Sequence, residues 1–401
     1  MPIHRPVIIA GAGPVGCTVA LKLSQAGIPV VLLEGLDDLP QTLRASTFHP
    51  PSLDMIAQLG MVERLKEQGL ICRYYQYRDR RTGAIAEFDL DVLREDTGHP
   101  YRLQVEQWKY TRLVWEELKA KYPSADLRFN AVVKGVHQTV DGVEVMVWEN
   151  GVEKVIEGSF AIATDGADSA LRKAVAIPFE GFTYPERFLV ASTPFPLEQK
   201  FDRLALVNYV SDPEEWLVLL RTPSLWRVLI PTDPAIENDA LWLSDEWIQQ
   251  RLHHMAPHDS DYEIIHRTIY RVHQRVAKTY TRGRVLIAGD AAHINNPLGG
   301  MGMNGGIHDA WNLSEKLIAV HGGADAAPLL ERYDRQRRGI CVKFVQEHTI
   351  KNKKLLESKD PEIQRKRQDE YMRTAADPHL ARQFLLQTSM IQSLRDEAAI
   401  H

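Results

Sequence analysis

The sequence lacks the features that mark several classes of protein. Its three cysteines, Cys17, Cys72 and Cys341, form no CxxC pair and no metal-ligand spacing, so we expect buried thiols, no metal site and a reducing, cytoplasmic setting. No apolar run approaches the ~20 residues that span a bilayer, and no secretory leader is recognisable. The net charge of −5 gives no electrostatic case for nucleic acid. We therefore expect neither membrane nor nucleic-acid partners.

The chain begins with the pattern of a nucleotide-binding βαβ unit. Residues 7–10 form a short apolar run that predicts a buried strand, and residues 15–26 have helical periodicity. Between them lie Gly11, Gly13 and Gly16, which permit a tight turn and a close approach of backbone to a pyrophosphate. Residues 30–33 predict the next strand, which closes with Glu34, where that acid would accept hydrogen bonds from a ribose diol. An acid here fits FAD or NAD and argues against a 2′-phosphate in this pocket.

A second stretch, residues 284–306, also indicates a ligand site. An apolar run at 285–288 predicts a strand, and Gly289-Asp290 follows at its carboxyl end. A glycine-rich turn at 297–302 leads into an amphipathic segment from about residue 303 to 320. A carboxylate and a helix N-terminus thus meet at one point, which suits a ribitol hydroxyl and an electron-rich ring. We interpret the stretch as the second half of a flavin site.

The rest of the chain predicts a second, β-rich region. Residues 74–90 resemble a hairpin, 132–156 a three-stranded meander, and 184–272 contain short β-rich runs, at 187–192, 204–210, 215–221 and 225–230. At 401 residues the chain suits two intimately joined domains. The predicted fold is α/β: a Rossmann-like FAD-binding domain (1–73, 104–183 and 276–330), an inserted β-rich substrate domain (74–103 and 184–275) and a C-terminal helical segment (331–401) that covers the cofactor domain or forms a dimer.

Three motifs in order carry a family resemblance. They are Gly11-x-Gly13-x-x-Gly16, then Thr164-Asp165-Gly166 with Arg172, then Gly289-Asp290 with the loop from Pro297 to Asn304. Together they resemble the class A flavoprotein aromatic hydroxylases, the family of p-hydroxybenzoate hydroxylase and the phenol hydroxylases, over about residues 5–340. The resemblance implies bound FAD, NADH or NADPH as a transient co-substrate, and hydroxylation of an activated aromatic ring by O₂ through a flavin hydroperoxide.

The resemblance also implies cofactor-binding residues. The ADP half of FAD would lie on the first motif and Glu34, the adenine near Val133, and the ribityl chain on Asp290. Asp165 and Gly166 would contact both FAD and the nicotinamide cofactor. The expected cofactor-binding set is Gly11, Ala12, Gly13, Pro14, Val15, Gly16, Glu34, Gly35, Arg44, Ala45, Gln104, Val133, Asp165, Gly166, Gly289, Asp290, Pro297, Gly300, Gly302, Met303 and Asn304.

Substrate-side residues are harder to find by pattern. Hydroxylation needs an electron-rich phenol, so a base, a proton relay or a cation near the ring is expected. Pro297 would mark where the ring meets the flavin, and Arg221 could hold an anionic substituent. The substrate-side candidates are His49, Pro297, Tyr209, Arg221 and His273, with Trp226 and Tyr270 as further aromatic candidates; for all of these except Pro297, simple packing or surface roles are an alternative.

The leading hypothesis is a monooxygenase acting on a phenol, nitrophenol or hydroxypyridine, with a small aromatic molecule and O₂ as partners and a homodimer as a possible assembly. One alternative is another flavoenzyme of this fold, a halogenase or a prenyl-chain reductase; the WxWxIP segment of such halogenases is absent from the sequence. The other is a flavin-binding redox sensor without catalysis.

Overall fold

The computed structural model describes residues 5–212, 215–347, 349–350, 353 and 360–401. Its first layer is a six-stranded sheet. All of its strands run parallel except the edge strand β18 (Thr281–Arg282), and parallel strands are what buried apolar runs predict. The strands at residues 7–10, 30–33 and 285–288 predicted from the sequence are confirmed. The order is β18 (Thr281–Arg282), β19 (Val285–Ile287), β12 (Phe160–Ala163), β1 (Val7–Ala10), β2 (Val30–Leu33) and β8 (Ala125–Arg128).

Helices pack on this sheet beside the meander. A Cβ at Gly306 would lie 2.6 Å from the Val15 side chain, so α1 and α8 approach closely. The predicted meander is confirmed, and its Asn150-Gly151 turn has positive φ at both residues, as a two-residue hairpin requires. These elements are α1 (Pro14–Gln25), α4 (Gln107–Lys121), α5 (Ala170–Ala174), α8 (Met301–His321), α9 (Ala326–Ile340), β9 (Ala131–Gln138), β10 (Val143–Glu149) and β11 (Val152–Gly158).

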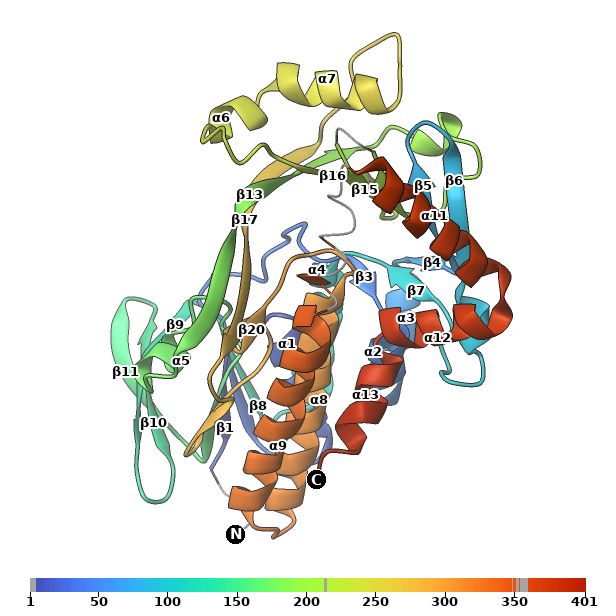
Figure 1. The fold of residues 1–401 in the computed structure, drawn as a ribbon. Helices are drawn as coiled ribbons and strands as arrows, with labels where there is room; N and C mark the ends of the chain where they lie inside the picture. The colour runs from blue at the N-terminus through green and yellow to red at the C-terminus, as the bar shows by residue number, and fades with distance from the viewer. Residues whose placement is uncertain (1–4, 213–214, 348, 351–352, 354–359) are drawn as a thin grey trace.

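The second large sheet has eight strands and lies beyond the first (Figure 1). Two of them, β13 and β17, are long and connect the two halves of the molecule. The order is β20 (His293–Ile294), β17 (His266–Ala277), β13 (Phe179–Thr193), β16 (Trp226–Pro231), β15 (Leu217–Arg221), β14 (Val207–Ser211), β5 (Tyr74–Asp79) and β6 (Gly83–Asp89), followed by the 3₁₀ turn Leu90–Leu93.

One sequence expectation is corrected in this sheet. A short strand was expected at 187–192, but β13 begins at Phe179 and pairs with β17 as far back as Ala277, with an irregularity between Thr183 and Arg187. Strand β13 therefore continues through the expected domain boundary at 184, and β17 continues through the one at 275. The irregularity bends the pair of strands without ending their pairing. The division into domains stays a prediction.

A small sheet joins the two halves. Its strands are β3 (Thr47–Phe48), β7 (Arg102–Gln104) and β4 (Leu70–Cys72), with β7 in the centre. Strand β3 leads directly into α2 (Pro50–Gln58), which is followed by α3 (Val62–Lys66). Beyond the large sheet lie α6 (Asp239–Trp242) and α7 (Asp245–Met255), preceded by the 3₁₀ turn Leu197–Gln199.

The C-terminal helices cross both halves of the molecule. After the π-helical turn Cys341–Gln346 come α11 (Pro361–Ala376), α12 (Pro378–Thr388) and α13 (Ile391–Ala398). Tyr371 of α11 stacks on Tyr77 of β5, and Phe384 of α12 stacks on Phe88 of β6. Helix α13 then returns to α9 (Figure 1). The segment therefore packs on the β-rich sheet as well as on the cofactor half.

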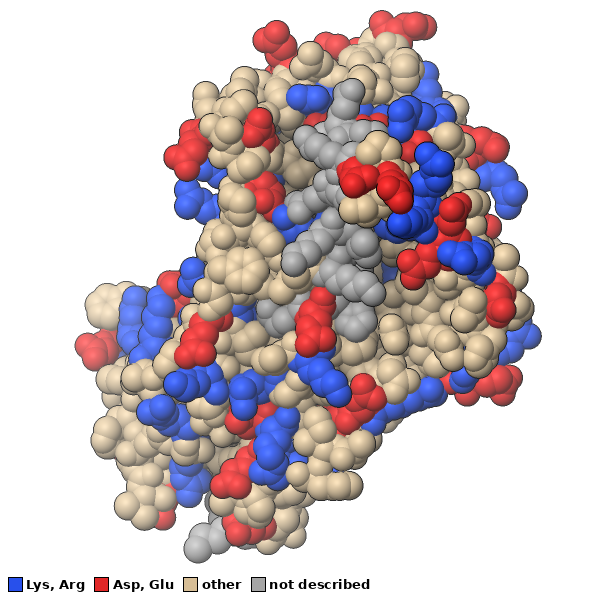
Figure 2. All heavy atoms as spheres, viewed as in Figure 1, with Lys and Arg blue, Asp and Glu red and all other residues tan. Residues whose placement is uncertain are grey.

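Acidic and basic side chains are interspersed over the face of the molecule shown in Figure 2. Within the described ranges, none of the helices is both long enough and apolar enough to span a bilayer.

Candidate active site

The first glycine turn brings backbone close to backbone. Gly11 has φ +97°, and a Cβ there would lie 2.6 Å from the Thr164 carbonyl oxygen. A Cβ at Gly16 would lie 2.0 Å from the Gly11 oxygen, whereas one at Gly13 would meet no atom within 4 Å. The Thr164 hydroxyl donates to the carbonyls of Ala10 and Gly11. The turn is thus fixed by Thr164, and the space beside Gly13 is open, as the binding of a pyrophosphate requires.

Glu34 organises the adenine end. Its carboxylate accepts hydrogen bonds from the amides of Ala12 and Leu36, both at 3.1 Å. The Glu34 carbonyl accepts from the amide of Ala131, which starts β9. Gly35 and the first residues of β9 therefore lie side by side, and Val133 follows in the same strand. The residues expected to hold ribose and adenine come together here.

The second and third motifs meet through an arginine. Arg172 donates to the carbonyl oxygens of Ala167 at 2.7 Å and Ala291 at 2.9 Å. Asp165 accepts from the Ala170 amide, but its other oxygen is buried without a hydrogen-bond partner among the described atoms. The side chain of Asp290 is exposed although the residues on both sides of it are buried. The carboxylates of Asp165 and Asp290 are thus both able to accept a hydrogen bond from a ligand.

A buried charge network supports the Gly289-Asp290 loop from behind. Asp309 accepts from the Gly289 amide at 3.1 Å, from His293 at 2.8 Å and from Arg337 at 2.7 Å, and Arg337 also pairs with Glu397 of α13. Burial alone would raise the pKa of Asp309, but Arg337 and His293 lower it to about 2. Burial opposes the charged form of His293, yet Cys341 and Asp309 hold its pKa well above 6.5. His293 therefore supports the loop.

The N-terminus of α8 is fixed by Asn304 and His49. Gly300, with φ +68°, caps the helix. The Asn304 side chain accepts from the His49 amide and donates to the Thr47 and Gly300 carbonyls. Burial and the charge of Arg102 lower the pKa of His49 well below its usual value, so the ring is neutral and its Nε2–H donates to the Gly299 carbonyl at 2.9 Å. Both side chains thus position the loop.

These observations test whether FAD fits. Gln104 is fully buried and its Oε1 accepts from Thr47, while its Nε2 has no hydrogen-bond partner among the described atoms. The open turn at Gly13, the exposed Asp290, this amide and the N-terminal amides of α8 are the kinds of donor and acceptor that an extended dinucleotide needs. The set fits FAD, which supplies the redox chemistry when bound. Arg44 is exposed next to it, and Ala45, Gly302 and Met303 are half-buried.

A cavity of about 50 Å³ adjoins the loop at the start of α8. The sheet contributes every second residue of β14 and β15, because side chains alternate between the two faces of a strand. Most of the lining is apolar. The cavity is lined by Thr47, Arg102, Val207, Tyr209, Val218, Leu220, Leu229, Pro297, Leu298, Gly299 and Gly300.

The structure separates the five substrate-side candidates. Pro297 and Tyr209 line this cavity. His49 does not line the cavity itself but bonds to the carbonyl of Gly299, which does. Arg221 follows Leu220 in β15, so it faces away from the cavity, and His273 of β17 bonds to Thr183 of β13. Neither Arg221 nor His273 is among the residues that line the cavity.

Several site residues were missed by sequence reasoning. Arg102 lines the cavity only two residues before the predicted Gln104, and Asp309 and Arg337 anchor the loop. The only sequence signal for Arg102 is its place in the short segment 101–105, where polar and apolar residues alternate. In such a segment an arginine resembles an ordinary exposed strand residue.

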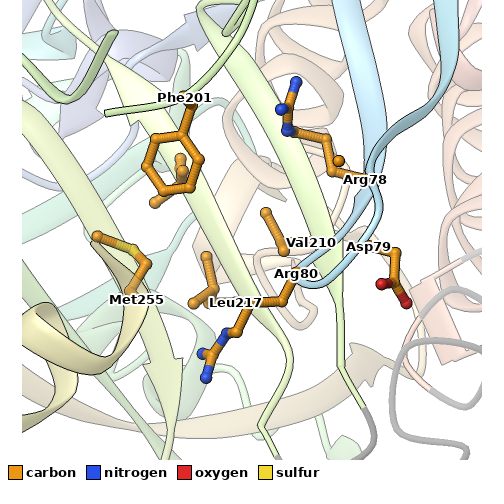
Figure 3. A pocket seen from close by; sticks show the side chains of 9 residues that line it. Arg78, Asp79, Arg80, Phe201, Val210, Leu217 and Met255 are labelled. Atoms are coloured by element: carbon orange, nitrogen blue, oxygen red, sulfur yellow. The ribbon is translucent and has the colours of Figure 1, made fainter. Parts of the chain in front are cut away.

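A second small cavity lies on the opposite face of the same sheet (Figure 3). It is lined by the alternate residues Val210, Leu217 and Leu219, with Phe201 and Met255. The loop that follows Pro297 lines only the first cavity. The cavity beside α8 is therefore the candidate substrate cavity.

A glycine-rich dinucleotide turn, together with a second glycine loop beside a mostly apolar cavity, is the arrangement expected of a flavoprotein monooxygenase. A family model described as an FAD binding domain matches residues 4–348, and the chain belongs to this family of class A flavoprotein aromatic hydroxylases. It is 33% identical to para-nitrophenol 4-monooxygenase of Pseudomonas sp. (strain WBC-3), over 97% of this chain and 96% of that one. It is 31% identical to 6-hydroxy-3-succinoylpyridine 3-monooxygenase of Pseudomonas putida (strain DSM 28022 / S16), over 90% and 91%.

A solved structure agrees. The p-nitrophenol 4-monooxygenase of Pseudomonas putida DLL-E4 superposes with a TM-score of 0.91 at 30% identity, covering 98% of this chain and 99% of that one. The expectations of an α/β FAD-binding fold, of bound FAD with NADH or NADPH as co-substrate, and of hydroxylation of an aromatic ring by O₂ are confirmed. The halogenase, prenyl-chain reductase and redox-sensor alternatives are not favoured.

Proposed function

We propose that the chain hydroxylates a small, single-ring phenol or hydroxypyridine, with nitrophenols as the first class to test. The observation that supports this is the cavity beside Pro297. Its volume of about 50 Å³ is several times the ~10–15 Å³ that one water needs, which suits one ring better than several fused rings. The relatives named for a nitrophenol and a hydroxypyridine over nearly their whole length support the same substrate class.

The test is substrate-stimulated turnover. We expect p-nitrophenol or 6-hydroxy-3-succinoylpyridine to stimulate NADH or NADPH oxidation and O₂ uptake, with a hydroxylated product seen by mass spectrometry. Nitrite release then shows whether the nitro group leaves. A fused-ring phenol serves as the negative control. Oxidation of the reduced nicotinamide with hydrogen peroxide as the only product for every single-ring substrate would contradict the proposal.

Two neighbouring positions give a matched pair of variants. Val218 and Leu217 are adjacent in β15 but line opposite cavities. Overpacking either side costs about 1–3 kcal/mol of stability, so both variants are expected to be destabilised alike. We expect Val218→Phe to raise the KM for the phenol strongly and Leu217→Phe to leave it near the wild-type value. Equal KM effects would place the substrate elsewhere.

The finer expectations of location and assembly belong to the same proposal. Three free, buried cysteines support a reducing, cytoplasmic setting. A homodimer is tested by sedimentation equilibrium of the FAD-loaded protein, and the preferred nicotinamide by comparing kcat/KM for NADH and NADPH.

A further inference from the structure

Arg102 is a buried cation without an acidic partner. Its side chain is 2% exposed in the centre of the small sheet, on β7. No carboxylate pairs with it among the described residues, and its Nε has no hydrogen-bond partner there. Burying an unpaired charge is costly, by several kcal/mol, unless a counter-charge arrives. The arginine is therefore a site that lacks its anion.

The surroundings hold the guanidinium in one place without neutralising it. It lies over the Tyr75 ring, 4.2 Å from its centroid, and interacts with the Tyr209 hydroxyl. Burial raises the pKa of Tyr75 and raises that of the nearby Cys72 to about 12, so both remain neutral near pH 7. His49, on the other side, is neutral too. The positive charge of Arg102 is thus uncompensated.

The guanidinium is also in the right place for a substrate. Arg102 and Tyr209 line the same cavity as the loop from Pro297 to Gly300. Of the described residues that line the cavity, Arg102 alone carries a charge. A ring between that loop and β14 would therefore have one charged group to face.

We propose that Arg102, with the Tyr209 hydroxyl beside it, is the subsite that binds the substrate's phenolate oxygen and keeps the phenol ionised. The proposal rests on the proposed function, since it supplies the electron-rich ring that hydroxylation needs. A guanidinium gains more from a full negative charge than from a neutral nitro group. The phenolate oxygen is therefore the group that it selects. The carboxylate of a longer side chain is a weaker candidate, because the cavity suits a single ring.

The test compares a phenol with its methyl ether on the FAD-loaded enzyme. We expect the wild type to bind 4-nitrophenol at least about tenfold more tightly than 4-nitroanisole, measured by the perturbation of flavin absorbance. We also expect the bound 4-nitrophenol to show the phenolate spectrum at a pH where the free compound is mostly neutral. Equal binding of the two compounds, or a neutral bound phenol, would overturn the proposal without any variant.

Variants then assign the effect to Arg102. Arg102→Met should lose the preference for the phenol and release the phenolate spectrum, whereas Arg102→Lys should retain part of both. Arg78→Met is the matched control: Arg78 is a buried arginine on β5 of the eight-stranded sheet that lines the other cavity and donates to Gln76 and to the Asp202 carbonyl. FAD content and melting temperature are measured for all three. An unchanged preference in folded, FAD-loaded Arg102→Met would reject the assignment.

The two proposals fail separately. If 4-nitrophenol binds as the phenolate but no ring is hydroxylated, the proposed function fails and the subsite stands. If the wild type hydroxylates nitrophenol and Arg102→Met binds and ionises it equally well, the subsite fails and the function stands. If no phenol binds, both fail.

Discussion

The FAD site and the substrate cavity are built differently, although they share one loop. The FAD site is made from short runs of adjacent residues, each at the end of a buried strand, and it depends mainly on backbone. The cavity is made from single side chains spread between Thr47 and Gly300 on two sheets and one loop. A backbone site has a readable sequence signature, whereas a side-chain site depends on which face each strand turns inward.

The largest expected effect tests the backbone half of this comparison. In Gly16→Ala the new Cβ would lie 2.0 Å from the Gly11 oxygen, so the turn must move. We expect a loss of more than about 4 kcal/mol of unfolding free energy, or no soluble protein. Gly13→Ala is the control, because its Cβ meets nothing within 4 Å: it should fold normally and bind FAD weakly. Urea unfolding and FAD titration measure both. A stable Gly16→Ala would contradict the account.

The same contrast explains which parts of the fold and of the site could be predicted from the sequence. The strands at 7–10, 30–33 and 285–288 were predictable because buried parallel strands are continuous apolar runs. The meander followed from two turn dipeptides. The length of β13 was not predictable, because Pro185 and the irregularity near it resemble a strand end, and only pairing with β17 continues the strand. Arg102 was missed because nothing local shows that a short strand will be central and buried.

The second prediction concerns support for the loop from distant residues. Asp309→Asn removes the charge that Arg337 and His293 share. Leaving His293 without its carboxylate and Arg337 with Glu397 alone should cost about 3–5 kcal/mol of unfolding free energy in urea and loosen FAD. Glu362→Gln, in an exposed pair with Lys366 on α11, is the control and should change stability by less than about 1 kcal/mol. Similar small losses for both variants would show that the network is dispensable.

Acid titration adds the third prediction. The pKa of Asp309 is about 2 in the folded chain against 3.8 for the ordinary side chain. A lowered folded pKa contributes stability that is full above about pH 4 and lost as pH falls toward 2. Compared with wild type, Asp309→Asn should therefore show a flatter fall of unfolding free energy over that interval. Parallel curves would remove Asp309 from the acid response.

The fourth prediction separates a cofactor contact from a structural residue. Asp290 is exposed, so Asp290→Ala should leave the apoprotein melting temperature nearly unchanged and weaken FAD binding roughly 10- to 100-fold. Asp168 is the control: an exposed aspartate of the neighbouring motif, paired with Lys173 on the surface. Asp168→Ala should bind FAD normally. Unchanged FAD occupancy in Asp290→Ala would remove that residue from the site.

The smallest expected effect tests where the cavity wall ends. Arg221 follows Leu220 in β15, and because side chains alternate it lies near the Trp226 ring instead of in the cavity. His273 is held at 2.8 Å by the Thr183 hydroxyl. We expect Arg221→Met and His273→Ala to change the phenol KM by less than about twofold, since residues outside a site act within about 0.5 kcal/mol. Steady-state kinetics at saturating NADH or NADPH measure this. A tenfold rise for Arg221→Met would mean that β15 turns its other face to the substrate, and a tenfold rise for His273→Ala would place the substrate against β17. In either case the cavity beside Pro297 would be the wrong one.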